Sequence, residues 1–360
     1  MPQAYINLAS LSHNVRRLRS RLEPGVQMLA AVKANAYGHG ALPVAQHLAA
    51  QGVSWFGVAT AAEAAELRAG NIAEPILIFS PVYEGVERLA EGDIRFTVAD
   101  EASLRPLESA KLKGANVHLK VDTGMSRLGL SGRDAVALAQ RIDASPHTVL
   151  EGVWTHFANA DDDSGATRDQ LERFHAVLDE LAKEGLEPPL IHAANSAAVI
   201  TYPAAQFDLV RPGIALYGYH SSPYVAGLEP ALRPVMTLTA PVTFVKRVAA
   251  GTPVSYGSLW RAPKPTTVLT VRMGYADGYP RLLTGRSEVT VQGQLRPLVG
   301  RVCMDQLMVD AGDLDVAVGE RVTLFGPGPL TAEVLAERVG TIAYEVLSGV
   351  GSRVERHYTT

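Results

Sequence analysis

Cysteine and concentrated positive charge are both scarce in this sequence. Cys303 is the single cysteine among 360 residues, so no disulfide can form within the chain, which suits a reducing compartment. Lysine and arginine number 33 against 37 aspartate and glutamate residues, giving a formal net charge of −4. The basic residues are scattered and no cationic run stands out, which argues against a nucleic-acid-binding protein, where a basic face is expected.

Long apolar runs are also missing. The N-terminus, MPQAYINLASLSHNVRRLRS, contains no apolar core of signal-peptide length, and no stretch elsewhere approaches the length of a membrane span. We therefore expect a cytoplasmic protein without a membrane segment. Hydrophobic residues nevertheless make up 47% of the chain, which provides ample core material, and the length suits two or three domains.

The stretch at 29–40, LAAVKANAYGHG, carries the first chemical signal. An apolar run leads into Lys33 and then breaks into small residues and glycines, which predicts a buried strand that ends in a loop. A lysine at such a strand tip is either a surface charge or an amine in a partly desolvated pocket, where a lowered pKa would suit it to form a Schiff base and carry protons. The nearby phenol of Tyr37, the imidazole of His39 and two glycines favour the second interpretation.

A regular alternation of strands and helices follows. Apolar, strand-like runs recur at 26–33, 53–59, 76–80, 94–98, 117–122, 149–157, 190–194 and 207–211. Helix-forming segments fill most of the gaps; one of them opens with the capping-box pair Thr60 and Glu63. Eight strands alternating with helices predict an α/β fold, a parallel (β/α)8 TIM-like barrel. The competing doubly wound sheet lacks its Gly-rich fingerprint after the first strand.

The chain changes character near residue 234. Short β-branched runs punctuated by glycine and proline replace the alternation, which predicts a mostly β C-terminal domain. We therefore expect a barrel domain at 1–233 and a β domain at 234–360. A short strand at 4–8 could pair within either of them, and an amphipathic helix is expected to start at Ser10.

Polar residues gather at the ends of the predicted barrel strands, where barrel active sites form. They are Lys33, Lys120, Asp122, Arg127, His156, His192, Asn195, Ser196 and Arg211. The loops after the seventh and eighth strands commonly hold phosphate, which makes Asn195, Ser196, Gly213 and Ile214 candidate ligands. Ser196 could equally be a plain helix N-cap, and the two histidines could be satisfied residues of the barrel interior.

The motifs of the chain resemble those of alanine racemases, the pyridoxal 5'-phosphate (PLP) enzymes of the barrel-fold group. The similar segments, in order, are AVKANAYGHG, KVDTGMSRLG, THFANAD, HAANSAA, RPGIALYG, VSYGSLW, GYADGYPR, GRVCMDQLMVD and YEVLSGVGSR. The resemblance runs from about Ala4 to Arg353. It departs from the family at Ser348, where cysteine is frequent, and in the opening INLAS, where an acidic residue is usual.

The resemblance implies a role for each matched residue. Lys33 would hold PLP and be one acid/base group, and Tyr256 from the partner subunit of a homodimer would be the other. Arg211 would face the pyridine nitrogen. The implied cofactor-binding residues are Lys33, Tyr37, His156, His192, Asn195, Ser196, Arg211, Gly213, Ile214 and Tyr344. The implied substrate-binding residues are Arg127, Met304 and Tyr275, the last of which would close access to the site.

The implied activity is the interconversion of L-alanine and D-alanine, which supplies D-alanine for peptidoglycan, and no metal is expected. Lys120 is expected near Arg127, either carbamylated by carbon dioxide, as in some members of the family, or paired as a lysine with Asp122. A related racemase or decarboxylase of larger amino acids is one alternative, although such decarboxylases place an acidic residue where this chain has Arg211. A non-catalytic PLP-binding protein is the other, although single-barrel carriers lack the β domain and Tyr256.

Overall fold

The structure, a computed structural model, describes residues 1–90, 92–229 and 231–360, and these divide into two compact units. The barrel unit contains Ser12–Ala36 and Ala41–Leu232, and the β unit contains Met1–Leu11, Tyr37–Gly40 and Arg233–Thr360. Each unit is therefore assembled from separate stretches of the chain. The functional boundary expected from the sequence, 1–233 against 234–360, stays a prediction.

The barrel unit is built on an eight-stranded parallel sheet, which confirms the predicted TIM-like architecture. Its strands are β2 (Gln27–Ala31), β3 (Trp55–Val58), β4 (Ile76–Ile78), β5 (Ile94–Val98), β6 (Ala115–Lys120), β7 (Thr148–Trp154), β8 (Leu190–His192) and β9 (Leu209–Val210). The sheet order runs from β8 through β2 to β9, and a parallel bridge between Asn195 and Arg211 links the two end strands just beyond their carboxyl ends. The interior is filled by a cluster around Leu29, Trp55 and Leu209.

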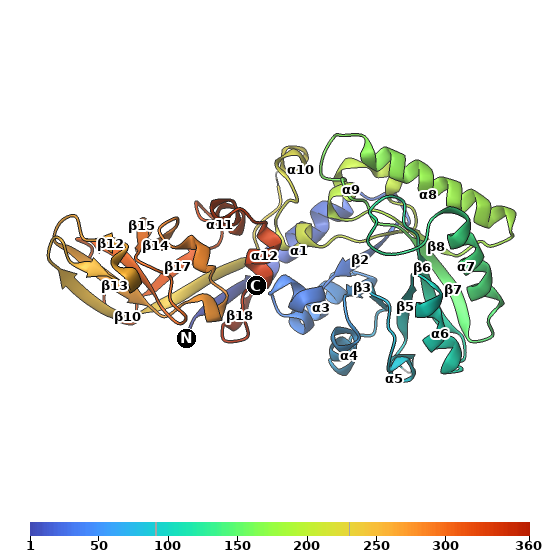
Figure 1. The fold of residues 1–360 in the computed structure, drawn as a ribbon, viewed down its shortest axis with the longest axis horizontal. Coiled ribbons are helices and arrows are strands. Elements are labelled where there is room, and N and C mark those ends of the chain that lie inside the picture. The colour runs from blue at the N-terminus through green and yellow to red at the C-terminus, as the bar shows by residue number, and fades with distance from the viewer. Residues whose placement is uncertain (91, 230) are drawn as a thin grey trace. The chain divides into compact units, whose positions relative to one another are not determined.

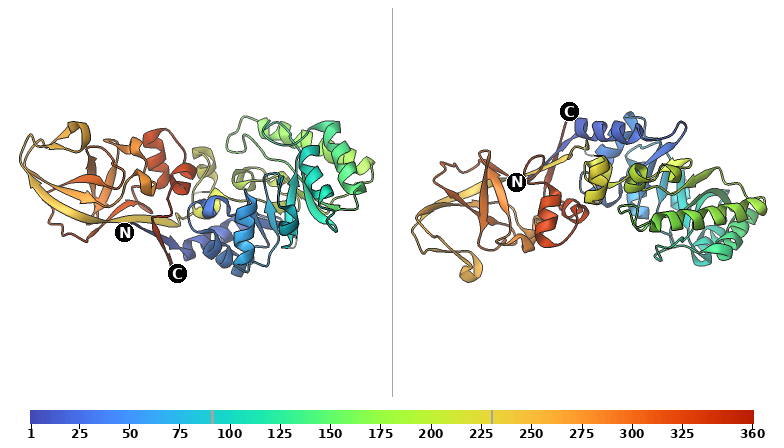
Figure 2. Two further views of the ribbon diagram at one scale, coloured as in Figure 1. Left: turned by 60° about the horizontal axis from the view of Figure 1, so that its bottom comes forward. Right: turned by 90° about the horizontal axis from the view of Figure 1, so that it is seen from above.

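Helices surround the outside of the barrel strands (Figures 1 and 2). They are α3 (Ala41–Ala50), α4 (Ala61–Ala69), α5 (Val86–Ala90), α6 (Glu101–Ser109), α7 (Gly132–Ala144), α8 (Ala166–Lys183), the short α9 (Ser196–Thr201) and α10 (Pro223–Leu228), with 3-10 helices η1 (Pro203–Ala205) and η2 (Ile214–Tyr217). The predicted capping box of α4 is present, with Thr60 accepting from the Glu63 N–H at 3.3 Å. None of the described helices combines the length and apolar character that crossing a membrane requires.

The first helix, α1 (Leu8–Arg19), starts earlier than the expected Ser10. The side chain of Asn7 accepts a hydrogen bond from the Ser10 N–H at 2.7 Å, so Asn7 caps the helix and Ser10 lies in its first turn. The expectation of a start at Ser10 was therefore wrong, because both Asn7 and Ser10 have side chains that can cap a helix and the sequence alone does not distinguish them.

The β unit contains a second eight-stranded sheet, in the order β13-β16-β15-β14-β17-β10-β1-β18, with β13 also pairing β10. Its elements are β1 (Gln3–Asn7), β10 (Met236–Val248), β13 (Thr266–Val271), β14 (Glu288–Val291), β15 (Gln294–Val299), β16 (Leu307–Gly312), β17 (Arg321–Phe325), β18 (Glu355–Thr359), the separate pair β11 (Pro253–Val254) and β12 (Trp260–Arg261), helices α11 (Ala332–Val339) and α12 (Ala343–Ser348), and the 3-10 helices η3 (Tyr256–Ser258), η4 (Tyr275–Asp277) and η5 (Arg281–Leu283). The predicted mostly β character is confirmed. The strand expected at 4–8 joins this sheet, between β10 and β18.

The chain makes a left-handed turn, α2 (Lys33–Tyr37), directly after the first barrel strand. Ala34, Asn35, Ala36 and Tyr37 all have φ between 52° and 55°. This region costs an L-residue about 1–2 kcal/mol, so four in succession need support from elsewhere. The Asn35 side chain accepts from the Ala41 N–H at 2.8 Å, and the Ala34 N–H donates to Glu63 at 2.6 Å. The expected loop is thus a single fixed turn that begins at Lys33.

Candidate active site

Lys33 lies at the carboxyl end of β2, inside the barrel unit. Its amine sits 5.9 Å from the centre of the Phe79 ring. Burial lowers the pKa of Lys33, the Arg127 cation lowers it further, and Glu63 opposes both effects. A lysine with a lowered pKa spends more of its time as the neutral amine, which is the form that attacks a carbonyl group or takes up a proton.

Arg211 directly follows β9 and is almost fully buried in the same unit. Its guanidinium donates to the carbonyl oxygens of Thr155 and Ala193 at 2.7 and 2.9 Å and lies 3.0 Å from Nδ1 of His192. Among the salt bridges of the described residues, none involves Arg211. Burial lowers the pKa of Arg211 to about 9, which still leaves it a cation at neutral pH.

The two predicted histidines both lie against this arginine. His192, at the end of β8, is fully buried and stacks on Trp154 with an angle of 4° between the ring planes. His156 has its Nδ1 3.5 Å from the Arg211 guanidinium. Burial, followed by the field of Arg211, holds the pKa of each histidine well below its usual range. Both are therefore neutral imidazoles at neutral pH.

The loops after β8 and β9 come together around one hydroxyl group. Ser196 Oγ accepts from the Gly213 N–H at 2.7 Å and from the Ala215 N–H at 3.4 Å. The N-cap of α9 is Asn195, whose side chain accepts from the Ala198 N–H at 3.0 Å, so the alternative that Ser196 caps this helix is wrong. Ile214 begins η2, and the N–H groups that open a helix have no partner within it, which favours an anion there.

Lys120 ends β6 and is buried beside the same arginine. Its amine donates to the carbonyl oxygens of Val121 and Leu128 at 2.6 and 3.2 Å and lies 5.3 Å from the Trp154 ring. Burial and then the Arg211 charge lower the pKa of Lys120 to about 7. The Asp122 carboxylate, in contrast, accepts three backbone N–H groups of its own loop.

Of the remaining predicted residues, Arg127 lies in the barrel unit, and the others lie in the β unit at three places. Tyr37 packs against Tyr344 of α12, with ring centres 5.9 Å apart. The Tyr275 N–H donates to the Cys303 carbonyl, and the following N–H donates to the Met304 carbonyl, so the η4 turn and the segment around Met304 are held together. Tyr256, in η3, is 72% exposed within this chain.

The structure also brings in residues that the sequence analysis did not select. Trp154 contacts three predicted site residues: its ring stacks on His192 and lies 4.9 Å from the Arg211 guanidinium and 5.3 Å from the Lys120 amine. Its signal in the sequence was positional, because it is the last strand residue before the THFANAD motif. His118 and Glu151, on β6 and β7, connect to His192 from inside the barrel.

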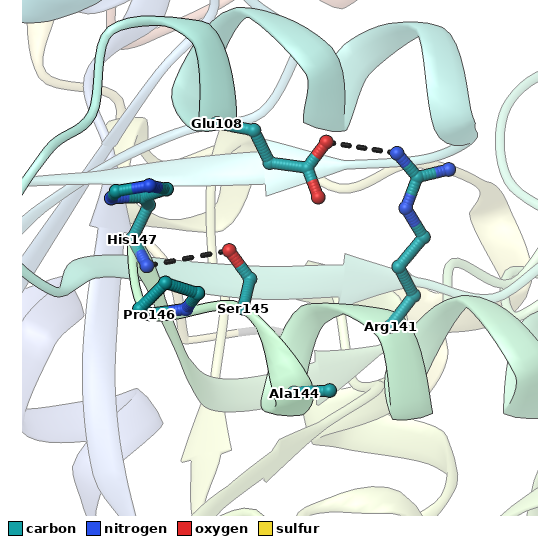
Figure 3. Close-up of a pocket in the computed structure, with 6 residues that line it drawn as sticks. All are labelled: Glu108, Arg141, Ala144, Ser145, Pro146 and His147. Atoms are coloured by element: carbon teal, nitrogen blue, oxygen red, sulfur yellow. Dashed lines mark hydrogen bonds and ion pairs between the residues drawn. The ribbon is translucent and has the colours of Figure 1, made fainter.

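One pocket of about 450 Å³ lies elsewhere on the barrel unit (Figure 3). It is lined by Glu108, Arg141, Ala144, Ser145, Pro146 and His147. His147 directly precedes β7, so this pocket lies at the amino ends of the strands, whereas Lys33 and Arg211 follow the carboxyl ends. The Glu108 carboxylate and the Arg141 guanidinium form an ion pair at 2.8 Å that neutralises both charges. We therefore assign this pocket no part in the chemistry. In the described part of the chain no cluster of His, Cys, Asp and Glu could hold a metal ion.

Comparisons with known proteins agree over the whole length of the chain. The families described as "Alanine racemase, N-terminal domain" and "Alanine racemase, C-terminal domain" match residues 6–221 and 235–358. The alanine racemase of Desulforamulus reducens is 42% identical over 362 residues, covering 99% of this chain and 98% of the relative. That of Deinococcus radiodurans is 44% identical over 357 residues, covering 98% and 97%.

Solved structures give the same result. The alanine racemase of Streptomyces lavendulae superposes with a TM-score of 0.93 at 39% identity, over 100% of this chain and 97% of the solved one. The alanine racemase of Bacillus anthracis, solved with bound L-Ala-P, superposes with a TM-score of 0.95 at 33% identity, over 100% of this chain and 95% of the solved one.

Proposed function

The chain belongs to the alanine racemase family and is an isomerase that interconverts L-alanine and D-alanine. From that premise we propose that it binds PLP at the carboxyl ends of the barrel strands. We propose further that two bases, Lys33 and Tyr256, carry out the racemisation. The observation that carries the proposal is that the desolvated Lys33 and the buried Arg211 cation both lie at the carboxyl ends of the barrel strands. Enzymes of this family are in general PLP-dependent.

The residues of the barrel unit fit this cofactor. PLP offers an aldehyde, a pyridine nitrogen and a phosphate, which call for an amine, a polar partner and a set of N–H donors. Lys33 supplies the amine, Arg211 the partner, and the loops joined by Ser196 the donors, including the N–H groups that open η2 at Ile214. Tyr37 and Tyr344, which contact each other in the β unit, are assigned to the phosphate as well.

PLP supplies an electron-withdrawing ring that acidifies the α-carbon of an amino acid joined to it. Racemisation then requires that a proton leave one face of the α-carbon and that another return to the opposite face, so the protein must present two bases. Lys33 Nζ takes or gives the proton on one face. Tyr256 Oη, supplied by the partner subunit, serves the other.

Arg211 sets the electronic character of the ring. A guanidinium does not give up its proton readily, so Arg211 would hold the ring nitrogen by a hydrogen bond without protonating it. The carbonyl oxygens of Thr155 and Ala193 and the neutral His192 hold the guanidinium in place. By leaving the ring nitrogen unprotonated, Arg211 would limit the withdrawal of electrons and so favour proton return over side reactions. An acidic residue here would suit the decarboxylase alternative, and Arg211 argues against it.

A homodimer with shared sites is supported by the exposed apolar side chains near Tyr256 in the β unit. Leu259 and Met304 are 59% and 54% exposed, and Tyr275 is also exposed. Exposed apolar groups concentrated in this way are typical of surfaces that a partner covers. In the proposed dimer Arg127 and the Met304 N–H bind the substrate carboxylate, and Tyr275 closes access to the site.

Carbamylation of Lys120 is part of the same proposal. With a pKa near 7 the buried amine is available in its neutral form at neutral pH. Its nitrogen would attack the carbon of carbon dioxide and lose a proton, forming an N–C bond and leaving one negative charge. That anion would neutralise the field of Arg127 and Arg211, which otherwise face a third cation in a buried place. Electron density that continues beyond Nζ would support the modification, and density that stops there would contradict it.

Circular dichroism of an L-alanine solution incubated with the holoenzyme tests the activity. Loss of optical activity without release of carbon dioxide is expected, because the α-carbon exchanges one proton for another and keeps its carboxylate. Lys33→Ala should abolish the change, whereas Lys183→Ala, on the exposed end of α8, should not. Conversion of lysine or arginine but not alanine would favour the alternative of a racemase for larger amino acids. We propose that the enzyme acts in the cytoplasm and that its product, D-alanine, is used to make peptidoglycan.

A further inference from the structure

Four side chains form an unbroken line of hydrogen bonds through the barrel interior. Arg211 Nη1 lies 3.0 Å from His192 Nδ1, His192 Nε2 lies 2.8 Å from His118 Nδ1, and His118 Nε2 lies 2.9 Å from a carboxylate oxygen of Glu151. Both imidazoles are completely buried. The line connects the proposed cofactor end of the barrel to a carboxylate that none of the proposed catalytic steps uses.

The geometry allows only one protonation pattern. A guanidinium can only donate, so His192 Nδ1 must accept, and the ring proton of the neutral His192 must lie on Nε2. That proton points at His118 Nδ1, which must therefore accept, so the His118 proton lies on Nε2 and points at Glu151. A doubly protonated His118 would leave His192 accepting at both nitrogens, which a neutral imidazole cannot do. Every donor in the line thus points from Arg211 towards Glu151.

The backbone is modified locally to build this line. Val117 of β6 pairs with Leu150, but the next residue, His118, pairs with Gly152, so Glu151 is an extra residue in β7. Such a bulge is rare between parallel strands and typically redirects a side chain near a functional site. A Cβ atom on Gly152 would come within 2.5 Å of His118 Nδ1, so only glycine leaves room for the imidazole.

The carboxylate end of the line is anionic. Burial acts to raise the pKa of Glu151, but hydrogen bonds from His118 and then from Arg95 outweigh it, and the pKa is lowered. Arg95 binds both carboxylate oxygens and also pairs with Asp93 at 2.6 Å. Since no described carboxylate forms a salt bridge with Arg211, Glu151 is the nearest negative charge to which hydrogen bonds connect it.

We infer that Glu151 is the remote counter-ion of Arg211 and that His118 is a positioning residue, which through His192 fixes the guanidinium that faces the cofactor. The inference rests on the proposed role of Arg211. The three hydrogen bonds and two imidazole rings separate the charges by at most roughly 13 Å. At an effective dielectric of about 20, their interaction then corresponds to at least about a tenfold change in the equilibrium constant for keeping both groups charged.

Glu151→Gln removes the charge and keeps the shape. The Gln carbonyl should occupy the oxygen position that accepts from both His118 and Arg95 Nε, because the amide N–H group would face two donors there; in the other position it faces only Arg95 Nη2, whose hydrogen bond is lost. We expect kcat of the holoenzyme to fall about tenfold with KM within twofold, since Glu151 is not among the proposed substrate contacts. The control is Glu229→Gln, which removes another buried carboxylate held by Arg17 and Arg21, at 3.0 and 2.7 Å, and should leave kcat unchanged.

Nitrogen NMR of the histidine rings in the ¹⁵N-labelled holoenzyme tests the line independently of activity. We expect His118 and His192 to be neutral at pH 7 with the proton on Nε2. A proton on His192 Nδ1, a charged ring at either position, or equal losses of kcat in the two glutamine variants would overturn the inference. If Glu151→Gln does not fold, Glu151→Met serves instead, because it also removes the charge, and the same kcat and KM expectation applies.

Failure of the underlying proposal would look different. If Arg211→Lys left kcat and the absorbance of the bound cofactor unchanged, the proposed role of Arg211 would be wrong. The assigned tautomers of His118 and His192 in the wild type would still stand. The expected tautomers together with an unchanged kcat in Glu151→Gln would instead overturn the counter-ion role alone.

Discussion

Removing the hydroxyl of Ser196 should weaken both the fold and cofactor binding, and the two losses can be measured separately. Ser196 Oγ is the acceptor for the Gly213 N–H at 2.7 Å and for the Ala215 N–H at 3.4 Å. In Ser196→Ala these buried donors lose their acceptor, which costs about 1–3 kcal/mol of unfolding free energy, most of it from the shorter bond. The proposed phosphate ligand is lost in the same change, so cofactor affinity should fall at least about tenfold.

The assay compares urea unfolding of the cofactor-free protein with fluorescence titration of PLP into it. Ser222→Ala is the matched control, because Ser222 accepts from the Val225 N–H at 3.3 Å and caps α10, so its loss should cost about 1 kcal/mol in stability with no change in affinity. If Ser196→Ala lowered the unfolding free energy yet bound PLP as tightly as the wild type, Ser196 would only tie two loops together and the phosphate assignment would be wrong.

Three further predictions test other parts of the site. Lys33→Ala and Tyr256→Phe should each be nearly inactive, but a mixture with confirmed subunit exchange should regain about a quarter of the wild-type sites if exchange is random, because hybrids contain one site with both bases; no recovery would place Tyr256 in its own chain's site or outside the mechanism. Arg211→Glu should lose racemase activity and add a long-wavelength absorbance to the bound cofactor, since a carboxylic acid can protonate the ring nitrogen; an unchanged spectrum would mean that Arg211 does not face the ring. In buffer freed of carbon dioxide, where Lys120 stays unmodified, its pKa is about 7 in the folded chain against 10.5 for the free side chain, so the unfolded chain binds the extra proton between these values and stability should rise with pH through that window. The gain should disappear in Lys120→Met, as urea midpoints at pH 7, 8 and 9 would report, and equal differences between the two proteins at all three pH values would contradict the shift.

The barrel could be predicted from the sequence because parallel strands buried on both faces are read as short apolar runs, and because its helices carry strong local signals such as the Thr60 and Glu63 pair. Lys33, His192 and Arg211 could be selected for a related reason, since each lies at or just beyond the carboxyl end of a strand. These features depend on interactions close in sequence, and the structure confirms where they place the residues.

Other features depend on contacts that no local pattern reveals. The left-handed turn after Lys33 is supported by Asn35 reaching Ala41 and by Glu63 from another helix, while the residues themselves favour a different conformation. Glu151 escaped selection because the β7 bulge breaks the alternation by which strand residues are assigned to a face. In the sequence Glu151 precedes Gly152, which looks like an ordinary strand glycine. Only the pairing with β6 shows that Gly152 leaves room for the His118 ring.

The position of β1 has a consequence for how the chain is made. Gln3 pairs with Thr239 of β10 on one side and with Glu355 of β18 on the other, so this strand acquires no sheet partner until about two thirds of the polypeptide exists. At roughly 5–20 residues per second, the ribosome needs on the order of 10–50 s to reach β10, and the barrel strands emerge during that interval. A nascent edge strand is therefore available for pairing with other chains throughout. Recombinant fragments should respect the same constraint: a piece that starts at residue 234 lacks the strand between β10 and β18, and it should aggregate unless residues 1–11 are supplied with it.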